Sequence, residues 1–406
     1  MLDWLALGPL VLLTIVVALL FDFYNGLHDA ANSIATVVAT KALPVWLALL
    51  LAATANFIGA FGGTAVAATI GAGIINTTLL APHITQVVLA ALVGAIFWSV
   101  LTVVLGIPIS SSQSLIGGLM GAAIAATGLA GIQAPHLHEL QFLGFLLGKG
   151  ALEGAVAGLL VALVARSSWK AGPLLGAAVG SAANLVWAIL VQHYAPNKLL
   201  ATLLFIAYSP FIGFVMAFLF IAIISWAFRK AAPSQVKHIF RFLQIGSSTF
   251  YSLQHGKNDA QKTMGVITAV LIAVGAIQLQ GKVDLKHFPV PTEVILACGI
   301  AMGLGTLIGG HKIVRTMGTR LTHLDTSQGF AAETSSAIGL YYLAEYGVPV
   351  STTHSITGSI LGVGAFQRAS AVSWGTARRI VTAWVITIPA AAGVAALAYW
   401  ALQPFL

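Results

Sequence analysis

The sequence predicts an all-α protein that crosses a lipid membrane many times. Of its 406 residues, 58% are hydrophobic and only 7% are charged, and the mean hydropathy is +0.95. Soluble domains carry about 25% charged residues, so this composition excludes a soluble domain. Because a spanning helix needs about 20 apolar residues and the chain has many such runs, we expect roughly 10–12 transmembrane segments.

Glycine content and the form of the apolar runs favour helices over a barrel. The 42 glycines suit membrane helices, which pack closely through small residues. The alternating pattern of barrel strands is absent. The single cysteine, Cys298, excludes an intramolecular disulfide. The net charge of +8 fits Lys and Arg in cytoplasmic loops, and without a basic stripe that interleaves aromatic residues, nucleic acid is not an expected partner.

The first unusual element is the segment "NGLHDAAN" at 25–32, which directly follows a long apolar run. It places His28, Asp29 and Asn32 beside what should be a membrane-spanning helix. Ionisable groups inside membrane segments are costly, so they are candidates for function by default. This segment is therefore the first candidate site.

Three segments of the first half recur, in the same order, in the second half. One such similarity can arise by chance, because Gly, Ala and Ser are abundant, but three in order indicate two homologous halves. The matched segments are 25–32 with 255–262, 62–71 with 309–318, and 106–121 with 347–362. The first match aligns Asp29 with Asp259, which strengthens the functional interpretation of both carboxylates.

The repeats divide the chain into three parts. Residues 1–228 form the first repeat, and the segment near 131–198 within it has no counterpart later, so we interpret it as inserted helices. Residues 246–406 form the second repeat. Between them, 229–245 is a basic cytoplasmic connector under the positive-inside rule, with a lipid-headgroup patch as the alternative. Its cations are Arg229, Lys230, Lys237 and Arg241.

The third matched pair reads "PISSSQS" and "PVSTTHS". Proline followed by Ser or Thr is a helix-start signature, because hydroxyls cap the free N–H groups. Ordinary capping at a membrane surface explains one copy, but two copies that face each other would surround an oxyanion such as phosphate or sulfate. Carboxylates beside an anion make sense if Na⁺ lies between them or if they carry a proton. The residues thus favour a cation-coupled oxyanion symporter with its site between the halves.

Taken together, these motifs resemble the inorganic phosphate transporter (PiT) family, which includes Na⁺- and H⁺-coupled phosphate carriers. The resemblance covers nearly the whole chain. It implies two inverted repeats, each with a broken first helix and a re-entrant helical hairpin, and phosphate bound between the hairpin tips. It also implies phosphate import with a cation, Na⁺ or H⁺, by alternating access in the cell membrane.

Carried over by position, the resemblance assigns ligands in both halves. The implied phosphate ligands are Ser110, Ser111, Ser112, Gln113, Ser351, Thr352, Thr353, His354 and Asn258. The implied ligands of the cation, including Na⁺, are Asp29, Asn32 and Asp259. Two positions depart from the family pattern: His28 stands where the second copy has Asn258, and Lys262 stands where the first copy has Asn32. Since histidine has an unperturbed pKa of about 6.5, His28 is a candidate for proton coupling.

Several alternatives compete with this interpretation. A sulfate permease on the same fold is the nearest, but an acceptor such as Asp29 or Asp259 favours phosphate, which carries a proton at neutral pH. Metal–phosphate complexes are another possible cargo. An enzyme is disfavoured because G-x-S-x-G and H-E-x-x-H motifs are absent, and a passive anion channel because carboxylates repel anions. We expect no cofactor beyond the coupling ion; the expected partners are phosphate, the cation and the bilayer, and a homodimer is compatible with the sequence.

Overall fold

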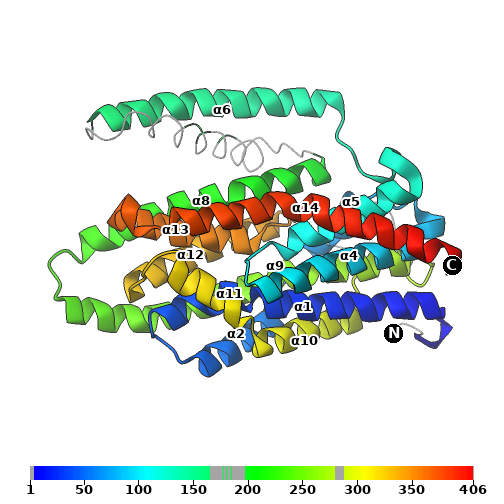
Figure 1. The fold of residues 1–406 in the computed structure, drawn as a ribbon, viewed down its shortest axis with the longest axis horizontal. Coiled ribbons are helices and arrows are strands. Elements are labelled where there is room, and N and C mark those ends of the chain that lie inside the picture. The colour runs from blue at the N-terminus through cyan, green and yellow to red at the C-terminus, as the bar shows by residue number, and fades with distance from the viewer. Residues whose placement is uncertain are drawn as a thin grey trace.

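The computed structural model describes residues 4–164, 197–278 and 288–405, and in addition residues 177, 180 and 184. Within these residues the chain forms helices and no β-strand, which confirms the predicted all-α class (Figure 1). The main helices are α1 (Pro9–Ala39), α2 (Val45–Gly59), α3 (Ala65–Gly73), α4 (Ile84–Leu105), α5 (Ser111–Thr127), α6 (Leu137–Val164), α8 (Lys198–Ala227), α9 (Pro233–Ala273), α10 (Thr292–Ile308), α11 (His311–Arg315), η4 (Thr316–Arg320), α12 (Thr326–Glu345), α13 (Thr352–Gln367) and α14 (Trp374–Leu402). Short helical turns lie at Trp4–Ala6, Ala81–His83, Gly128–Gly131, Ala369–Ala371 and Gln403–Phe405.

Five of these helical segments are long and apolar enough to cross a membrane. They are Pro9–Ala39, Ala81–Leu105, Ser111–Gly131, Lys198–Ala227 and Trp374–Leu402. A sixth is Thr292–Ile308 with His311–Arg320, which is bent by 62°. The described residues thus contain five or six candidate spans, and the roughly 10–12 transmembrane segments expected from the sequence stay a prediction. Large apolar side chains that point outward, such as Trp46, Phe97 and Val385, fit a lipid-facing surface.

The helices α1 and α9 cross inside the bundle as antiparallel neighbours. His255 on α9 lies beside Asp29 on α1, and Ser248, two turns earlier on α9, donates to the carbonyl oxygen of Ser33, one turn later on α1. Contacts thus advance along α1 as they move back along α9. The two matched polar segments, 25–32 and 255–262, are thereby brought face to face.

The predicted break in these helices is wrong, because α1 and α9 continue through both polar segments. Glycine explains how polar residues are accommodated without opening the backbone. A Cβ on Gly26 would collide with the carbonyl of Met302 on α10, and one on Gly256 with the carbonyl of Asn56 on α2. Each glycine therefore lets a neighbouring helix approach closely, and only side chains face the polar centre. The bend instead lies between α10 and α11, where Gly309 has a φ of 72°.

Helices from one half pack against helices from the other half. α5 packs against α14, with Gly117 and Gly121 on the backbone of Ile388 and Ala392. In the same way α13 packs against α8, with Gly358 and Gly362 on the backbone of Pro210 and Phe214. Added methyl groups at these glycines would overlap carbonyl oxygens, so close helix packing depends on them.

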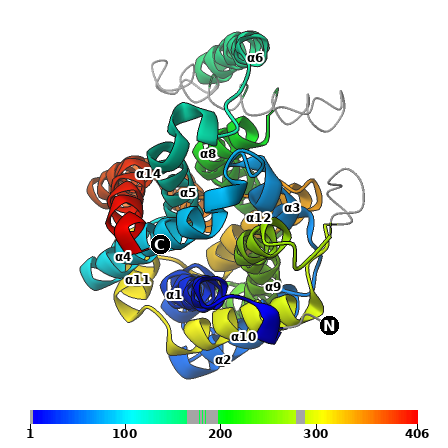
Figure 2. The ribbon, with the colours of Figure 1, turned by 90° about the vertical axis from the view of Figure 1, so that its right-hand side faces the viewer.

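Residues around the predicted insertion and connector are partly described. The described part of 131–198 consists mainly of α6, which lies outside the main bundle near α8 in both views (Figures 1 and 2). Most of the later apolar run of that segment falls outside the described residues. The connector predicted at 229–245 is a short turn followed by the first turns of α9, and its Arg241 donates to the carbonyl oxygen of Ala42 at 3.3 Å.

Buried apolar side chains form the packing around the polar centre. One large cluster includes Leu115 of α5 and Met264 of α9, and another includes Tyr251 of α9 and Ile356 of α13. Both clusters combine residues from the two halves of the sequence. The polar segments are therefore embedded in a common core, not placed at a domain surface.

Candidate functional site

Two aligned carboxylates meet inside the bundle. Asp29 on α1 and Asp259 on α9 are both 0% exposed. The imidazole of His255 lies between them, with Nε2 at 3.7 Å from Oδ2 of Asp29 and 3.5 Å from Oδ2 of Asp259. Ligand atoms of the three side chains lie within 4.8 Å of one another. The pairing of Asp29 with Asp259 in the sequence thus corresponds to one shared centre, which we call the acid centre.

Asp29 is surrounded by donors from three helices. His28 places Nδ1 at 2.6 Å from Oδ1 of Asp29. Ser111, in the first turn of α5, donates to Oδ2 at 3.2 Å. From the first turn of α13, Thr352 and Thr353 make longer hydrogen bonds of 3.5 Å to the same carboxylate. The starts of both α5 and α13 therefore converge on one acid.

Asp259 is paired with a lysine. The Nζ atom of Lys262 lies 2.5 Å from Oδ1 of Asp259, one turn earlier on the same helix. The same ammonium donates to Oγ of Ser112 and, at 3.2 Å, to the carbonyl oxygen of Val350. Asn258 also donates to Val350, at 3.0 Å. The second half thus contributes a fixed positive charge to the acid centre.

Asn32 contacts a neighbouring hydroxyl. It lies one turn after Asp29 on α1, and its Nδ2 donates to Oγ1 of Thr353 at 2.9 Å. Of the three predicted cation ligands, Asp29 and Asp259 are themselves part of the acid centre. Asn32 holds a hydroxyl that also reaches Asp29.

Two of the predicted tip residues cap their own helices. Oγ of Ser110 accepts from the backbone N–H of Gln113 at 3.3 Å, and Oγ of Ser351 accepts from that of His354 at 3.2 Å. These contacts match the helix-start signature in the sequence. Since all four residues are buried, both helices begin inside the protein and not at its surface.

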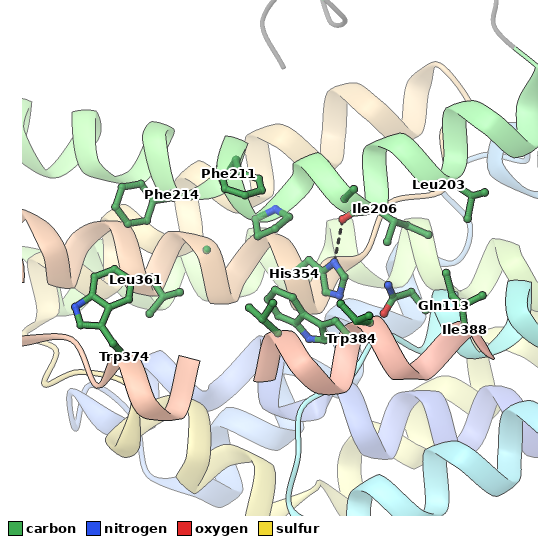
Figure 3. Close-up of a pocket in the computed structure, with 15 residues that line it drawn as sticks. Gln113, Leu203, Ile206, Phe211, Phe214, His354, Leu361, Trp374, Trp384 and Ile388 are labelled. Carbon is green, nitrogen blue, oxygen red and sulfur yellow. Dashed lines mark hydrogen bonds between the residues drawn. The ribbon is translucent and has the colours of Figure 1, made fainter. Parts of the chain in front are cut away.

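The side chains of Gln113 and His354 turn towards an apolar pocket of about 520 Å³ between α8, α13 and α14 (Figure 3). His354 donates through Nδ1 to the carbonyl oxygen of Ile206 at 2.9 Å, and its ring lies 3.8 Å from that of Trp384. The structure therefore does not bring these two side chains to the acid centre with the other tip residues.

His255 is not among the site residues predicted from the sequence, although its spacing from Asp259 points to it. It stands four residues before Asp259, which places both on one face of α9. Its Nδ1 lies 3.1 Å from Oδ1 of Asn56, whose Nδ2 donates to Thr306 at 2.9 Å. These neighbours hold the ring so that Nε2 faces both acids.

The chemistry available at the acid centre is the binding of a small cation beside an oxyanion. Carboxylate, hydroxyl and carbonyl oxygens are ligands that hard cations prefer. Among the buried polar atoms of the described residues that have no hydrogen-bond partner are His28 Nε2, His255 Nε2, Asn258 Oδ1 and Asp259 Oδ2, which belong to residues at or next to the acid centre. The hydroxyls and free N–H groups at the starts of α5 and α13 suit an anion. Asp29, His255 and Asp259 are the residues that could hold the cation.

Long apolar helices around a buried, charged polar centre define the chain as an integral membrane transporter. Its sequence matches the profile of the phosphate transporter family over residues 25–395. The chain therefore belongs to the phosphate transporter family, as its repeated motifs predict, and it transports phosphate.

Known proteins resemble the chain over nearly its whole length. A probable low-affinity inorganic phosphate transporter of Rhizobium meliloti is 44% identical over 97% of this chain and 96% of its own length. A protein described in the same words from Bacillus subtilis is 37% identical, with 97% of both chains covered. A solved structure described as the sodium-dependent phosphate transporter has a TM-score of 0.69 and covers 98% of this chain and 100% of its own, and at 24% identity it shows a shared fold. The relatives are transporters, in agreement with the prediction that the chain is not an enzyme.

Replacing His255 by Gln is expected to lower the phosphate uptake rate about tenfold, because both buried carboxylates lose the imidazole nitrogen that lies between them, and a buried polar group left without its partner costs about 1–3 kcal/mol. The amide can keep the contact to Asn56, but it cannot at the same time place a second nitrogen between Asp29 and Asp259. Initial uptake rates in proteoliposomes measure the effect. The matched control is His311→Gln at the exposed start of α11, which should leave the rate unchanged. Equal rates for the two variants would exclude a role for His255.

Proposed function

We propose that the protein imports phosphate in symport with a cation, Na⁺ or H⁺, by alternating access in the cell membrane. The observation that carries this proposal is the acid centre itself. Asp29 and Asp259, from the two halves, lie together with hydroxyls from the starts of α5 and α13. Carboxylates and an incoming phosphate repel each other, so a bound cation is needed for both to occupy this place.

In this proposal the phosphate is held by the hydroxyls and free N–H groups of the two helix starts. Its ligands are Ser111, Ser112, Thr352, Thr353 and Asn258, which border the acid centre. Ser110 and Ser351 support them as helix caps. Gln113 and His354 take part indirectly: their backbone N–H groups hold the capping hydroxyls of Ser110 and Ser351, while their side chains face the apolar pocket.

The coupling cation binds beside Asp29, with Asp259, Asn32 and His255 around it. Two observations support different ions. The structural relative is a sodium-dependent phosphate transporter, and this supports Na⁺. The imidazoles of His28 and His255, which both approach Asp29, support a proton. Whether it is Na⁺ or a proton, the coupling ion supplies one mobile positive charge to the acid centre.

Alternating access requires two units that move relative to one another. We propose that residues 1–228 and 246–406 are inverted repeats, with the inserted helices near 131–198 in the first. The antiparallel crossing of α1 and α9 and the exchanged packing of α5 on α14 and α13 on α8 support this proposal. A site shared by both halves then opens to either side as they move.

The test is uptake of radiolabelled phosphate into proteoliposomes, with Na⁺ and pH gradients imposed separately. We expect one of the two gradients to raise initial uptake at least tenfold over equal ionic conditions. Sulfate in tenfold excess should leave uptake unchanged, and a chelator of divalent cations should do the same. Uptake that is equal with and without gradients would indicate a channel. Competition by sulfate would indicate a sulfate permease, and loss of uptake with the chelator would indicate metal–phosphate cargo.

A further inference from the structure

Lys262 is held as a bound cation would be. Its side chain is buried, with 1% of the residue exposed, and its ammonium has three N–H donors. The three acceptors are a carboxylate oxygen of Asp259 at 2.5 Å, the hydroxyl of Ser112, and the carbonyl oxygen of Val350 at 3.2 Å. This is a set of three oxygen ligands from three separate segments of the chain. Each donor therefore has an oxygen to bind.

One contact of this arrangement recurs in the first half, with an amide in the place of the lysine. Position 262 aligns with Asn32, and Ser112 aligns with Thr353. The contact of Lys262 with Ser112 accordingly has a counterpart in the hydrogen bond from Asn32 to Thr353. In the first half an amide occupies the place of the ammonium. Within the described part of the chain, the basic groups next to the carboxylate of Asp29 are the imidazoles of His28 and His255.

A lysine at this place differs from a bound ion in one respect. It is covalently attached, so it neutralises Asp259 in every state of the transport cycle and is never released. A mobile cation at the same oxygens would enter with phosphate and leave with it, and its gradient would drive uptake. A buried carboxylate that lost its partner would be strongly disfavoured, so Asp259 needs one or the other.

We propose that Lys262 is a tethered cation that fills the second of two equivalent cation sites. The protein consequently couples phosphate to one mobile cation fewer than a chain with Asn at position 262 would. This inference rests on the proposed symport and names the residue that sets its ion requirement. It makes Lys262 a determinant of coupling, not a phosphate ligand.

The experiment replaces Lys262 by Asn, the residue of the first half, and measures two quantities. Binding of radiolabelled Na⁺ to the purified protein should rise by one ion per chain relative to the wild type. In proteoliposomes, uptake by Lys262→Asn without Na⁺ should fall at least tenfold and recover as external Na⁺ rises. The kinetic order of the uptake rate with respect to Na⁺ concentration should be higher by one in Lys262→Asn than in the wild type.

Two control variants separate charge from ligand oxygen. Lys262→Arg keeps a tethered cation, so its Na⁺ binding should equal that of the wild type. The double variant Asp259→Asn with Lys262→Asn removes both charges, so it should bind no additional Na⁺. The double variant also tests the idea if Lys262→Asn alone does not fold without Na⁺, because added Na⁺ should then stabilise only the single variant against heating.

Unchanged Na⁺ binding by folded Lys262→Asn would overturn the inference. An additional Na⁺ bound by the double variant would overturn it as well. Failure of the proposed symport would be seen differently, as wild-type uptake that does not respond to either gradient. The Na⁺-binding comparison does not depend on uptake, so the two failures are distinguishable.

Discussion

Replacing Asp29 by Asn is expected to lower phosphate uptake about 100-fold or more. The carboxylate pairs with His28 at 2.6 Å and accepts hydrogen bonds from the starts of α5 and α13. Removing one member of a buried ion pair costs about 3–5 kcal/mol, and about 1.4 kcal/mol corresponds to a factor of ten. A neutral amide also supplies no negative charge to hold a cation beside phosphate. Initial uptake rates at equal amounts of reconstituted protein measure the loss.

The matched control for this variant is Asp325→Asn. Asp325 is the exposed N-cap of α12, and asparagine caps a helix about as well as aspartate. Uptake by this variant should equal that of the wild type. If Asp29→Asn retained more than about half of the wild-type rate, Asp29 would have no place in the acid centre's function.

Replacing Gly358 by Ala is expected to destabilise the folded protein by about 3 kcal/mol or more, the upper part of the range for overpacked cores. The added methyl group would overlap the carbonyl of Pro210 on α8, and a helix backbone cannot move aside as a flexible side chain can. α13 must therefore separate from α8. Because Thr352 and Thr353 begin α13, the separation also moves them away from Asp29. The midpoint of thermal unfolding in detergent should fall clearly.

Gly393 provides the control for the glycine substitution. It lies in α14, and a Cβ added there meets nothing within 4 Å. Gly393→Ala should leave the protein unchanged or stabilise it by up to about 1 kcal/mol, since alanine favours helices over glycine. A melting midpoint for Gly358→Ala as high as that for Gly393→Ala would show that the close contact between α13 and α8 is unimportant.

Those residues of the acid centre and its surroundings that recur in both halves could be predicted from the sequence. Asp29 aligns with Asp259, and the hydroxyl segments that contain Ser111 and Thr352 align with each other, so comparison of the repeats marked all four. In the structure they lie in one place. Repetition is informative here because a costly buried charge that appears twice has a common cause in both halves.

Residues that differ between the halves were harder to predict. His255 aligns with an asparagine, so the comparison of repeats gave it no weight, although its spacing from Asp259 placed both on one helix face. Gln113 and His354 follow the hydroxyls directly, but each residue of a helix turns by about 100°, and this turns their side chains towards α8 and α14. The role of Lys262 required its three acceptors, which come from segments far apart in the sequence.

The continuity of α1 and α9 could not be predicted from the sequence either. The resemblance to the PiT family implied a broken first helix in each half, and exposed backbone groups are one way to place polar atoms in a membrane. In the structure, neighbouring helices instead pack closely against the polar segments of α1 and α9. Gly26 and Gly256 bring α10 and α2 against the polar segments, and the backbone hydrogen bonds of both helices remain intact.

The glycine contacts of α5 with α14 also bear on how the newly synthesised chain matures. α5 is made in the first half, but Gly117 and Gly121 find their packing partner only when α14, the last long helix, has been inserted. Until then α5 presents a surface of small residues that lacks its partner helix. A chain truncated before α14 would keep that surface exposed, and membrane quality control that recognises unpaired helices should remove it. Completion of the carboxyl-terminal helix is therefore the step at which the first half becomes fully packed.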